Sequence, residues 1–195
     1  MSVDQLWATW RSLYVTGDPE SRRALPGELA DSSATSSSSE TEPQSLFERI
    51  LNCGAPDSET FVLHRGSDCF VILNRFPYTS GHLMILPNRA VANLEDLGPS
   101  EFEELWRLVR DGVTVLKAKL NCDGVNIGVN LGRAAGGSQT DHLHVHCVPR
   151  WIGDANFMAL IGGSQVMPVA LGDLWAVLSA AWPDSPENAA AGTVI

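Results

Sequence analysis

Residues 142–149 read His-Leu-His-Val-His-Cys-Val-Pro, so three histidines alternate with apolar residues in one short run. In an extended strand, successive side chains point to opposite faces. The pattern therefore predicts a strand with all three imidazoles on one face, neighbours being about 6.6 Å apart. A glycine-rich turn, Gly136-Gly137-Ser138, precedes the run. Together they place groups that titrate near neutral pH beside a loop of a size to bind phosphate.

Three uses would account for the row of histidines. A metal site is one, since His-x-His on a strand supplies two zinc ligands, but His142 and His146 would lie about 13 Å apart, too far for one ion to take all three. A purely structural role is another, although it would bury much polar surface without a use for it. The third is nucleophilic catalysis at phosphorus by a neutral imidazole, with the loop amides holding phosphate oxygens. Only this last use explains both features.

Composition limits the class of protein. The chain has 195 residues, 44% of them apolar, which suits one soluble domain with appendages. No apolar stretch approaches the roughly 20 residues that span a membrane, and no signal peptide is apparent, so we expect no membrane contact and a cytoplasmic location. A net charge of −10 argues against nucleic acid as a partner. The 4 cysteines are widely spaced, as reduced thiols are.

The chain divides into three parts by composition. Trp7 and Trp10 belong to an apolar pattern at helical spacing, so we expect residues 1–16 to form an N-terminal docking helix. Residues 17–45 are rich in Gly, Pro, Glu and Ser and predict a low-complexity linker. Residues 46–195 are then predicted to form the compact catalytic domain.

Within that domain, strands and short turns surround one long helix. Ser100 and Glu103 have the spacing of a capping box, and apolar residues at helical spacing follow, among them Phe102 and Trp106. This arrangement predicts an α+β domain with a mainly antiparallel sheet. The expected elements are a short helix through 50–51, strands at 61–64, 69–73, 82–86, 125–129 and 142–149, and a C-terminal helix over 169–182.

Several stretches resemble the histidine triad (HIT) superfamily over about residues 61–151. They are His142-x-His144-x-His146 after the glycine-rich loop, and residues 74–87, which read Asn-Arg-Phe-Pro-Tyr-Thr-Ser-Gly-His-Leu-Met-Ile-Leu-Pro. Residues 130–132, 135–138 and 149–151, with Leu6-Trp7-x-x-Trp10-Arg11, are similar to the bacterial branch that includes diadenosine tetraphosphate phosphorylases, also called ATP adenylyltransferases. The resemblance implies a HIT-like α+β fold that dimerises across the sheet, as a homodimer or a higher homo-oligomer.

The resemblance also implies catalytic roles for the three triad histidines, with His82 grouped among the substrate- and phosphate-binding residues as a support. His144 would attack an α-phosphorus and form a nucleotidyl-histidine intermediate. His142 would orient His144, with support from His82. His146 would contact the phosphate or the leaving oxygen. Preorganised donors of this kind act by positioning and by charge stabilisation.

Further residues are implied in substrate binding. Asn74 matches a position that holds the ribose, and Asn130 one near the phosphates. The loop Gly136-Gly137-Ser138 would bind phosphate. Trp151 would stack on a base or close the site, the alternative being a core position. A divalent cation, if one takes part, would bridge the phosphates of the substrate, and no tightly bound cofactor is expected.

Ser138 bears on the choice of reaction. It stands where many HIT hydrolases carry glutamine, and a small hydroxyl there leaves room for inorganic phosphate as the second acceptor. The expected reaction is therefore phosphorolysis of diadenosine tetraphosphate to ATP and ADP. One alternative is a HIT hydrolase that releases AMP from dinucleoside polyphosphates or adenylyl adducts. Another is a catalytically weak nucleotide-binding or interaction protein.

Structural zinc is not expected in this chain. Relatives often carry C-x-x-C near the start of the domain and a histidine after the strand that ends in proline. Here the corresponding residues are Ser45, Glu48 and Ala90. Only the first triad histidine would remain as a ligand, so the sequence predicts a domain without metal.

Overall fold

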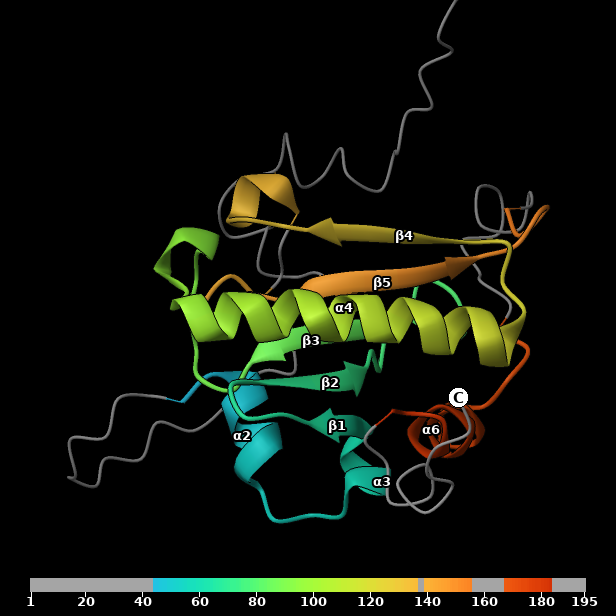
Figure 1. The fold of residues 1–195 in the computed structure, drawn as a ribbon, viewed down its shortest axis with the longest axis horizontal. Coiled ribbons are helices and arrows are strands. Elements are labelled where there is room, and N and C mark those ends of the chain that lie inside the picture. Colours follow the sequence, from blue (N-terminus) through green and yellow to red (C-terminus); the bar gives the residue numbers. More distant parts are fainter. Residues whose placement is uncertain (1–43, 137–138, 156–166, 184–195) are drawn as a thin grey trace, which may run out of the picture. The chain divides into compact units, whose positions relative to one another are not determined.

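The computed structural model describes residues 44–136, 139–155 and 167–183. The N-terminal helix predicted over 1–16, and all but the last two residues of the linker predicted over 17–45, lie outside these ranges. The described part holds one antiparallel sheet of five strands in the order β1-β2-β3-β5-β4 (Figure 1). The strands are β1 (Val62–Arg65), β2 (Cys69–Leu73), β3 (Leu83–Pro87), β4 (Gly124–Val129) and β5 (Val145–Arg150).

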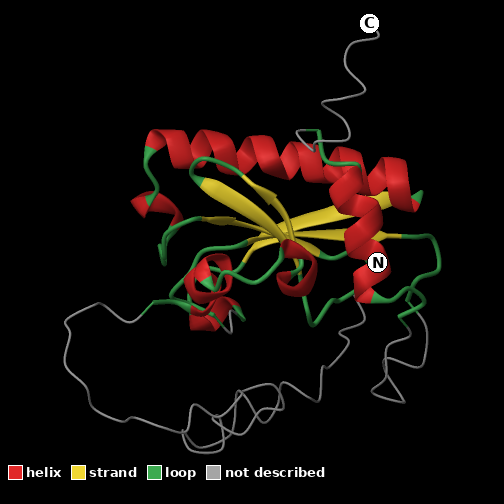
Figure 2. Cartoon of the chain, turned by 90° about the horizontal axis from the view of Figure 1, so that it is seen from below, coloured by secondary structure: helices red, strands yellow, loops and turns green. Residues whose placement is uncertain are grey.

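Helices cover both faces of this sheet, which confirms the α+β class. The long helix runs along one face (Figure 2). The C-terminal helix falls within the predicted range 169–182 and packs beside the long helix and β1. The helices are α2 (Leu46–Asn52), α3 (Asp57–Thr60), α4 (Pro99–Leu120) and α6 (Leu171–Ala180), with short 3₁₀ turns at Leu94–Asp96 and Arg133–Ala135.

Two apolar clusters divide the core, one on each face of the sheet. Alternate residues of β2 show the division, since Val71 belongs to the cluster under α4 and α6, whereas Phe70 belongs to the cluster under α2. All five residues of β2 are buried, as expected of a strand covered on both sides. The cluster beneath α2 includes Met84, whose register partner on β5 is His146. The histidines therefore belong to the face that α2 covers.

The start of α4 corrects one prediction. The helix begins at Pro99, not at the capping box predicted from Ser100 and Glu103. Proline suits the first helical position because that position has no intrahelical use for an N–H group. Gly98 is thus the N-cap residue, and its N–H donates to the Glu101 carboxylate at 2.7 Å.

The buried side of α4 agrees only in part with the apolar pattern predicted for it, since Leu105, Val109 and Leu116 of that pattern are buried but its two aromatic residues are not. Leu105, Leu108 and Gly112 are buried, and an added Cβ at Gly112 would lie 3.3 Å from a Leu83 methyl group. Trp106 lies about 120° around the axis from Gly112 at 3.6 residues per turn. Trp106 is consequently 37% exposed, and Phe102, on the same side, is 45% exposed. Helical spacing alone did not predict that these two aromatic side chains lie outside the core.

Candidate active site

Only one of the three triad histidines lies within a strand. Strand β5 begins at Val145, so the predicted strand over 142–149 is too long at its start. The backbone before β5 finds other partners: the Leu143 N–H donates to the Val91 carbonyl at 2.6 Å, and the His142 carbonyl receives a side chain. Instead of being evenly spaced at about 6.6 Å, the rings of His144 and His146 have centroids 4.7 Å apart, edge to face.

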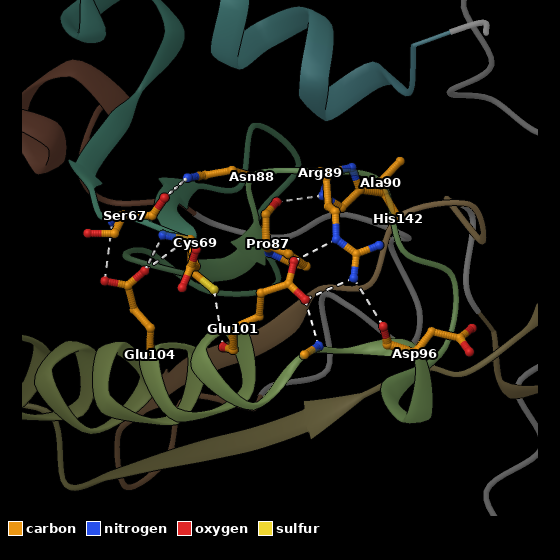
Figure 3. Close-up of polar contacts among 12 residues, drawn as sticks. Ser67, Cys69, Pro87, Asn88, Arg89, Ala90, Asp96, Glu101, Glu104 and His142 are labelled. Atoms are coloured by element: carbon orange, nitrogen blue, oxygen red, sulfur yellow. Dashed lines mark hydrogen bonds and ion pairs between the residues drawn. The ribbon is translucent and has the colours of Figure 1, made fainter.

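His142 is buried between two hydrogen-bond partners. Its Nε2 lies 2.8 Å from the Pro87 carbonyl oxygen (Figure 3), and its Nδ1 lies 2.7 Å from the Ser45 hydroxyl. Because a carbonyl oxygen only accepts, Nε2 carries a proton. Burial lowers the pKa of His142, which favours the neutral ring. The Ser45 hydroxyl therefore donates to an unprotonated Nδ1.

His144 has one nitrogen fixed by the backbone. Its Nδ1 lies 2.9 Å from the main-chain oxygen of His142, so Nδ1 is the protonated nitrogen of the neutral ring. Nε2 then carries a lone pair, and no residue in the described part of the chain is hydrogen-bonded to it. Phe47 of α2 packs against the ring, with centroids 5.8 Å apart. The geometry presents a neutral imidazole nitrogen as a nucleophile.

His146 is oriented by a second pair of contacts. The main-chain N–H of Tyr78 donates to Nδ1 of His82 at 3.1 Å, so the proton of a neutral His82 is on Nε2. That Nε2 lies 2.9 Å from Nδ1 of His146, to which it donates. The neutral His146 is left with its proton on Nε2.

Burial keeps both of these imidazoles neutral. Desolvation, with a smaller effect of neighbouring histidines, lowers the pKa of His82 to about 3 and that of His146 to about 4. With both rings in their neutral forms, the cluster presents a lone pair on Nε2 of His144 and an N–H on Nε2 of the adjacent His146. A lone pair and a donor side by side suit displacement at phosphorus, in which a bond forms at one position as the leaving oxygen gains charge.

Two predicted binding residues lie against this cluster. The side-chain amide of Asn74 is 3.4 Å from Nδ1 of His82, and its oxygen accepts the Phe76 N–H at 2.9 Å. The side-chain amide of Asn130 is 3.4 Å from Nε2 of His146, and an Nε2–H in the tautomer assigned above requires the amide oxygen, not its NH₂ group, on that side. The structure therefore brings Asn74 and Asn130 together with the histidines.

The remaining predicted residues are placed differently. The indole N–H of Trp151 donates to the carbonyl of Leu120 at 3.3 Å, at the end of α4. That helix covers the face of the sheet opposite the histidines, so Trp151 does not join the cluster within this chain. Gly136 ends the 3₁₀ turn with φ of +93°, a conformation that glycine adopts readily. Gly137 and Ser138 lie outside the described residues.

The residues around His142 do not fit a zinc ion. Structural zinc takes four nitrogen or sulfur ligands, with carboxylates in some sites. Here the lone pair of His142 Nδ1 faces a serine hydroxyl, and Ala90 has no ligand atom. The Glu48 carboxylate instead accepts the N–H groups of Ala90 and Ser45, each at 2.9 Å. Across the described ranges, no group of three or more His, Cys, Asp or Glu could hold a metal.

Sequence reasoning missed two contributors to the site. One is the hydroxyl of Ser45, which is 97 positions from its partner His142. The other is the main-chain N–H of Tyr78. A signal for Ser45 existed, because Ser45 and Glu48 have capping-box spacing and do form the box at the start of α2. No local pattern pointed to Tyr78, since any residue except proline supplies that N–H.

The chain is similar to known proteins of one family. Residues 55–151 match the family described as HIT domain. The chain is 38% identical over 184 residues to AP-4-A phosphorylase of Mycobacterium tuberculosis, which covers 94% of this chain and 87% of that protein. It is also 38% identical over 93 residues to asymmetrical bis(5'-nucleosyl)-tetraphosphatase of Schizosaccharomyces pombe, covering 48% of this chain and 50% of that one.

Solved structures share the fold. A Zn-bound histidine triad family protein from Mycobacterium smegmatis superposes with a TM-score of 0.58 at 25% identity, covering 71% of this chain and 92% of that chain. A hypothetical histidine triad nucleotide-binding protein from Sulfolobus tokodaii gives 0.57 at 22% identity, covering 71% and 91%. Among the described residues, no helix combines the length and apolar character needed to cross a membrane.

Proposed function

Because the chain belongs to the HIT domain family, we propose that it cleaves diadenosine tetraphosphate by phosphorolysis, through an intermediate on His144. The observation that carries this proposal is the orientation of His144, whose Nδ1 is bonded to the His142 carbonyl and whose Nε2 lone pair is available for attack. The similarity to an AP-4-A phosphorylase over nearly the whole chain supports the choice of substrate.

The reaction has two displacement steps. Nε2 of His144 attacks the α-phosphorus next to one adenosine, and the bond from that phosphorus to the bridging oxygen breaks. ATP leaves, and AMP stays joined to His144. The N–H of His146 stabilises charge on the departing oxygen. An oxygen of inorganic phosphate then attacks the same phosphorus, the bond to His144 breaks, and ADP is released.

Hydrolysis is the competing reaction of the same intermediate. It is favoured by the similarity of residues in this domain to a bis(5'-nucleosyl)-tetraphosphatase, although that match covers only half of each chain. Water would then replace phosphate in the second step, giving AMP and ATP. The acceptor that is better positioned decides between the two outcomes.

Labelled inorganic phosphate distinguishes these reactions. The protein is incubated with diadenosine tetraphosphate and labelled phosphate, with and without Mg²⁺, and the nucleotides are separated. Label in ADP beside unlabelled ATP is the expected result. Equal formation of AMP and ATP without phosphate would identify a hydrolase. Nucleotide binding without turnover would identify the third alternative, a binding or interaction protein.

We further infer a homodimer or higher homo-oligomer that works in the cytoplasm. Strand β4 is an edge strand, and Ile127 on it is 48% exposed, which suits pairing with a second copy. The described cysteines, Cys53, Cys69, Cys122 and Cys147, are free thiols, as in a reducing compartment. Light scattering after size exclusion tests the oligomer, and a monomer at micromolar concentration would overturn it.

A further inference from the structure

Ser45 joins the start of α2 to the triad. Its side-chain oxygen accepts the N–H of Glu48 at 3.1 Å, which caps the helix, and its hydroxyl donates to Nδ1 of His142 at 2.7 Å. The residue is 4% exposed. The buried hydroxyl thus donates its proton to His142 and accepts the Glu48 N–H with a lone pair. It cannot rotate toward other partners without breaking one of these two hydrogen bonds.

We propose that Ser45 is a positioning residue for the triad: by donating to Nδ1 it holds His142 in the tautomer that bonds Pro87, and so fixes the main-chain oxygen that orients His144. The proposal rests on the proposed function for its kinetic consequence. Its structural content, the tautomer of His142, does not depend on which nucleotide is cleaved.

The first step of the argument is the rigidity of Ser45 itself. Glu48 returns the cap, since its carboxylate accepts the Ser45 N–H at 2.9 Å. The other oxygen of that carboxylate accepts the Ala90 N–H, also at 2.9 Å. Ala90 follows the end of β3, so the bond between Ala90 and Glu48 joins the start of α2 to the sheet. The Ser45 hydroxyl is therefore fixed relative to the strand that carries the Pro87 carbonyl.

The second step is the effect on His142. With Nε2 bonded to Pro87 and Nδ1 bonded to Ser45, both ring nitrogens of a neutral His142 are satisfied. Phe47 packs edge-on against the ring at 5.5 Å between centroids. Removal of the hydroxyl would leave a buried acceptor unsatisfied, which favours rotation of the ring or uptake of a proton near Glu48 and Asp141.

The third step connects His142 to the nucleophile. The carbonyl oxygen that receives Nδ1–H of His144 belongs to His142 itself, at 2.9 Å. A displaced His142 would move this acceptor. The His144 ring, and with it the lone pair on Nε2, would then be held less firmly in the direction of attack. Misplacement of a reacting group by about 1 Å lowers the rate about a hundredfold in enzymes. We therefore expect the effect of Ser45 in kcat more than in KM.

Four substitutions separate this role from helix capping. Ser45→Ala removes both functions, and Ser45→Thr keeps both. Ser45→Asp and Ser45→Asn are matched in size and both cap a helix, but only the amide of asparagine can donate to Nδ1. Ser179→Ala is the control for loss of a serine hydroxyl, since that hydroxyl bonds the Ala176 carbonyl on an exposed part of α6.

Kinetics and imidazole ¹⁵N spectra then test the proposal. We expect kcat of Ser45→Ala and Ser45→Asp to fall about tenfold or more, with Ser45→Thr close to wild type and Ser45→Asn above Ser45→Asp. The spectra should show His142 neutral with its proton on Nε2 in wild type and Ser45→Thr, and protonated on both nitrogens in Ser45→Asp.

Two results would overturn the proposal. One is a kcat of Ser45→Ala equal to that of Ser179→Ala, and the other is an unchanged His142 spectrum in both Ser45→Ala and Ser45→Asp. If wild-type protein cleaves no dinucleoside polyphosphate, the proposed function fails, whereas the spectra still decide whether Ser45 sets the tautomer of His142.

Discussion

The Nδ1 atom of His144 lies 2.9 Å from the main-chain oxygen of His142, two positions earlier. The acceptor is backbone, so substitution of the His142 side chain alone leaves the oxygen in the chain. The proton of His144 is thereby directed away from the side of the ring that would meet a phosphorus atom.

Replacement of His144 should remove the chemical step. We expect His144→Ala to lower turnover of diadenosine tetraphosphate by at least about a thousandfold, because the nucleophile is lost. Mass spectrometry should detect nucleotidylated wild-type protein and none in the variant. His64→Gln serves as the control, since His64 lies on β1 and stacks on Trp182 instead. Turnover by His144→Ala at the level of this control would exclude His144 as the nucleophile.

His82 should affect the rate through His146. His82→Leu removes the donor to His146 Nδ1, and we expect kcat to fall about tenfold, as for other residues that orient a reacting group. His82→Gln places an amide N–H near the position of the lost Nε2 and should recover part of this rate. Steady-state kinetics of the two variants provide the comparison. Equal rates in the two variants would show that the donor to His146 has no effect.

Gly81 should be intolerant of a side chain. Its φ is +85°, and an added Cβ would clash with a Leu120 methyl group and lie 3.5 Å from Pro149. We expect Gly81→Ala to lower the free energy of unfolding by about 1–3 kcal/mol, chiefly through backbone strain at this positive φ. Gly124→Ala is the matched control, because no atom lies within 4 Å of an added Cβ there. Urea unfolding measures both, and equal midpoints would contradict the expectation.

Stability should fall in mild acid because of the buried histidines. The pKa of His82 is about 3 and that of His146 about 4, both below the ordinary value of 6.5. Between pH 6.5 and 4, the unfolded chain binds protons at these residues and the folded chain does not. The free energy of unfolding therefore decreases as pH falls, by at most about 1.4 kcal/mol per pH unit for each histidine.

Urea unfolding at pH 7.5, 6 and 5 measures this slope. The lowered pKa values of Glu48, Glu101 and Glu104 affect stability only below their ordinary value of 4.5, outside this range. His82→Gln should have a shallower dependence on pH than wild type. A free energy of unfolding that is constant from pH 7.5 to 5 would show that these histidines titrate normally in the folded protein.

The sequence predicted β2 well and β5 less well for physical reasons. Residues 69–73 form a continuous apolar run, so both ends of β2 are marked by a change in polarity. The alternation that predicts β5 starts at His142, but the strand starts at Val145. Near this point the side chains of His142 and His144 donate to main-chain carbonyl oxygens, which are then occupied and less free to accept from a neighbouring strand. Periodicity in the sequence does not reveal this competition for acceptors.

The two capping-box patterns also show that spacing in the sequence does not by itself predict where a helix begins. Ser45 and Glu48 form a box, whereas Ser100 and Glu103 do not, because Pro99 at the first helical position moves the N-cap to Gly98. The row of histidines marked the candidate site in the sequence. The bond between Ser45 and His142 could not be predicted, since it depends on how residues 97 positions apart meet in the fold.

The place of β5 in the sheet also determines when the site can form. Strand β5 lies between β3 and β4, so β4 has no neighbour in the sheet until residues 145–150 are in place. Strand β5 also pairs with β3, although α4 and β4 lie between these two strands in the sequence. Contacts between strands so distant in sequence form slowly compared with a hairpin such as β2–β3. During synthesis, a chain that ends before Val145 lacks His146, the strand that supports it and any partner for β4. The histidine cluster can therefore assemble only after β5 has joined β3 and β4 in the sheet.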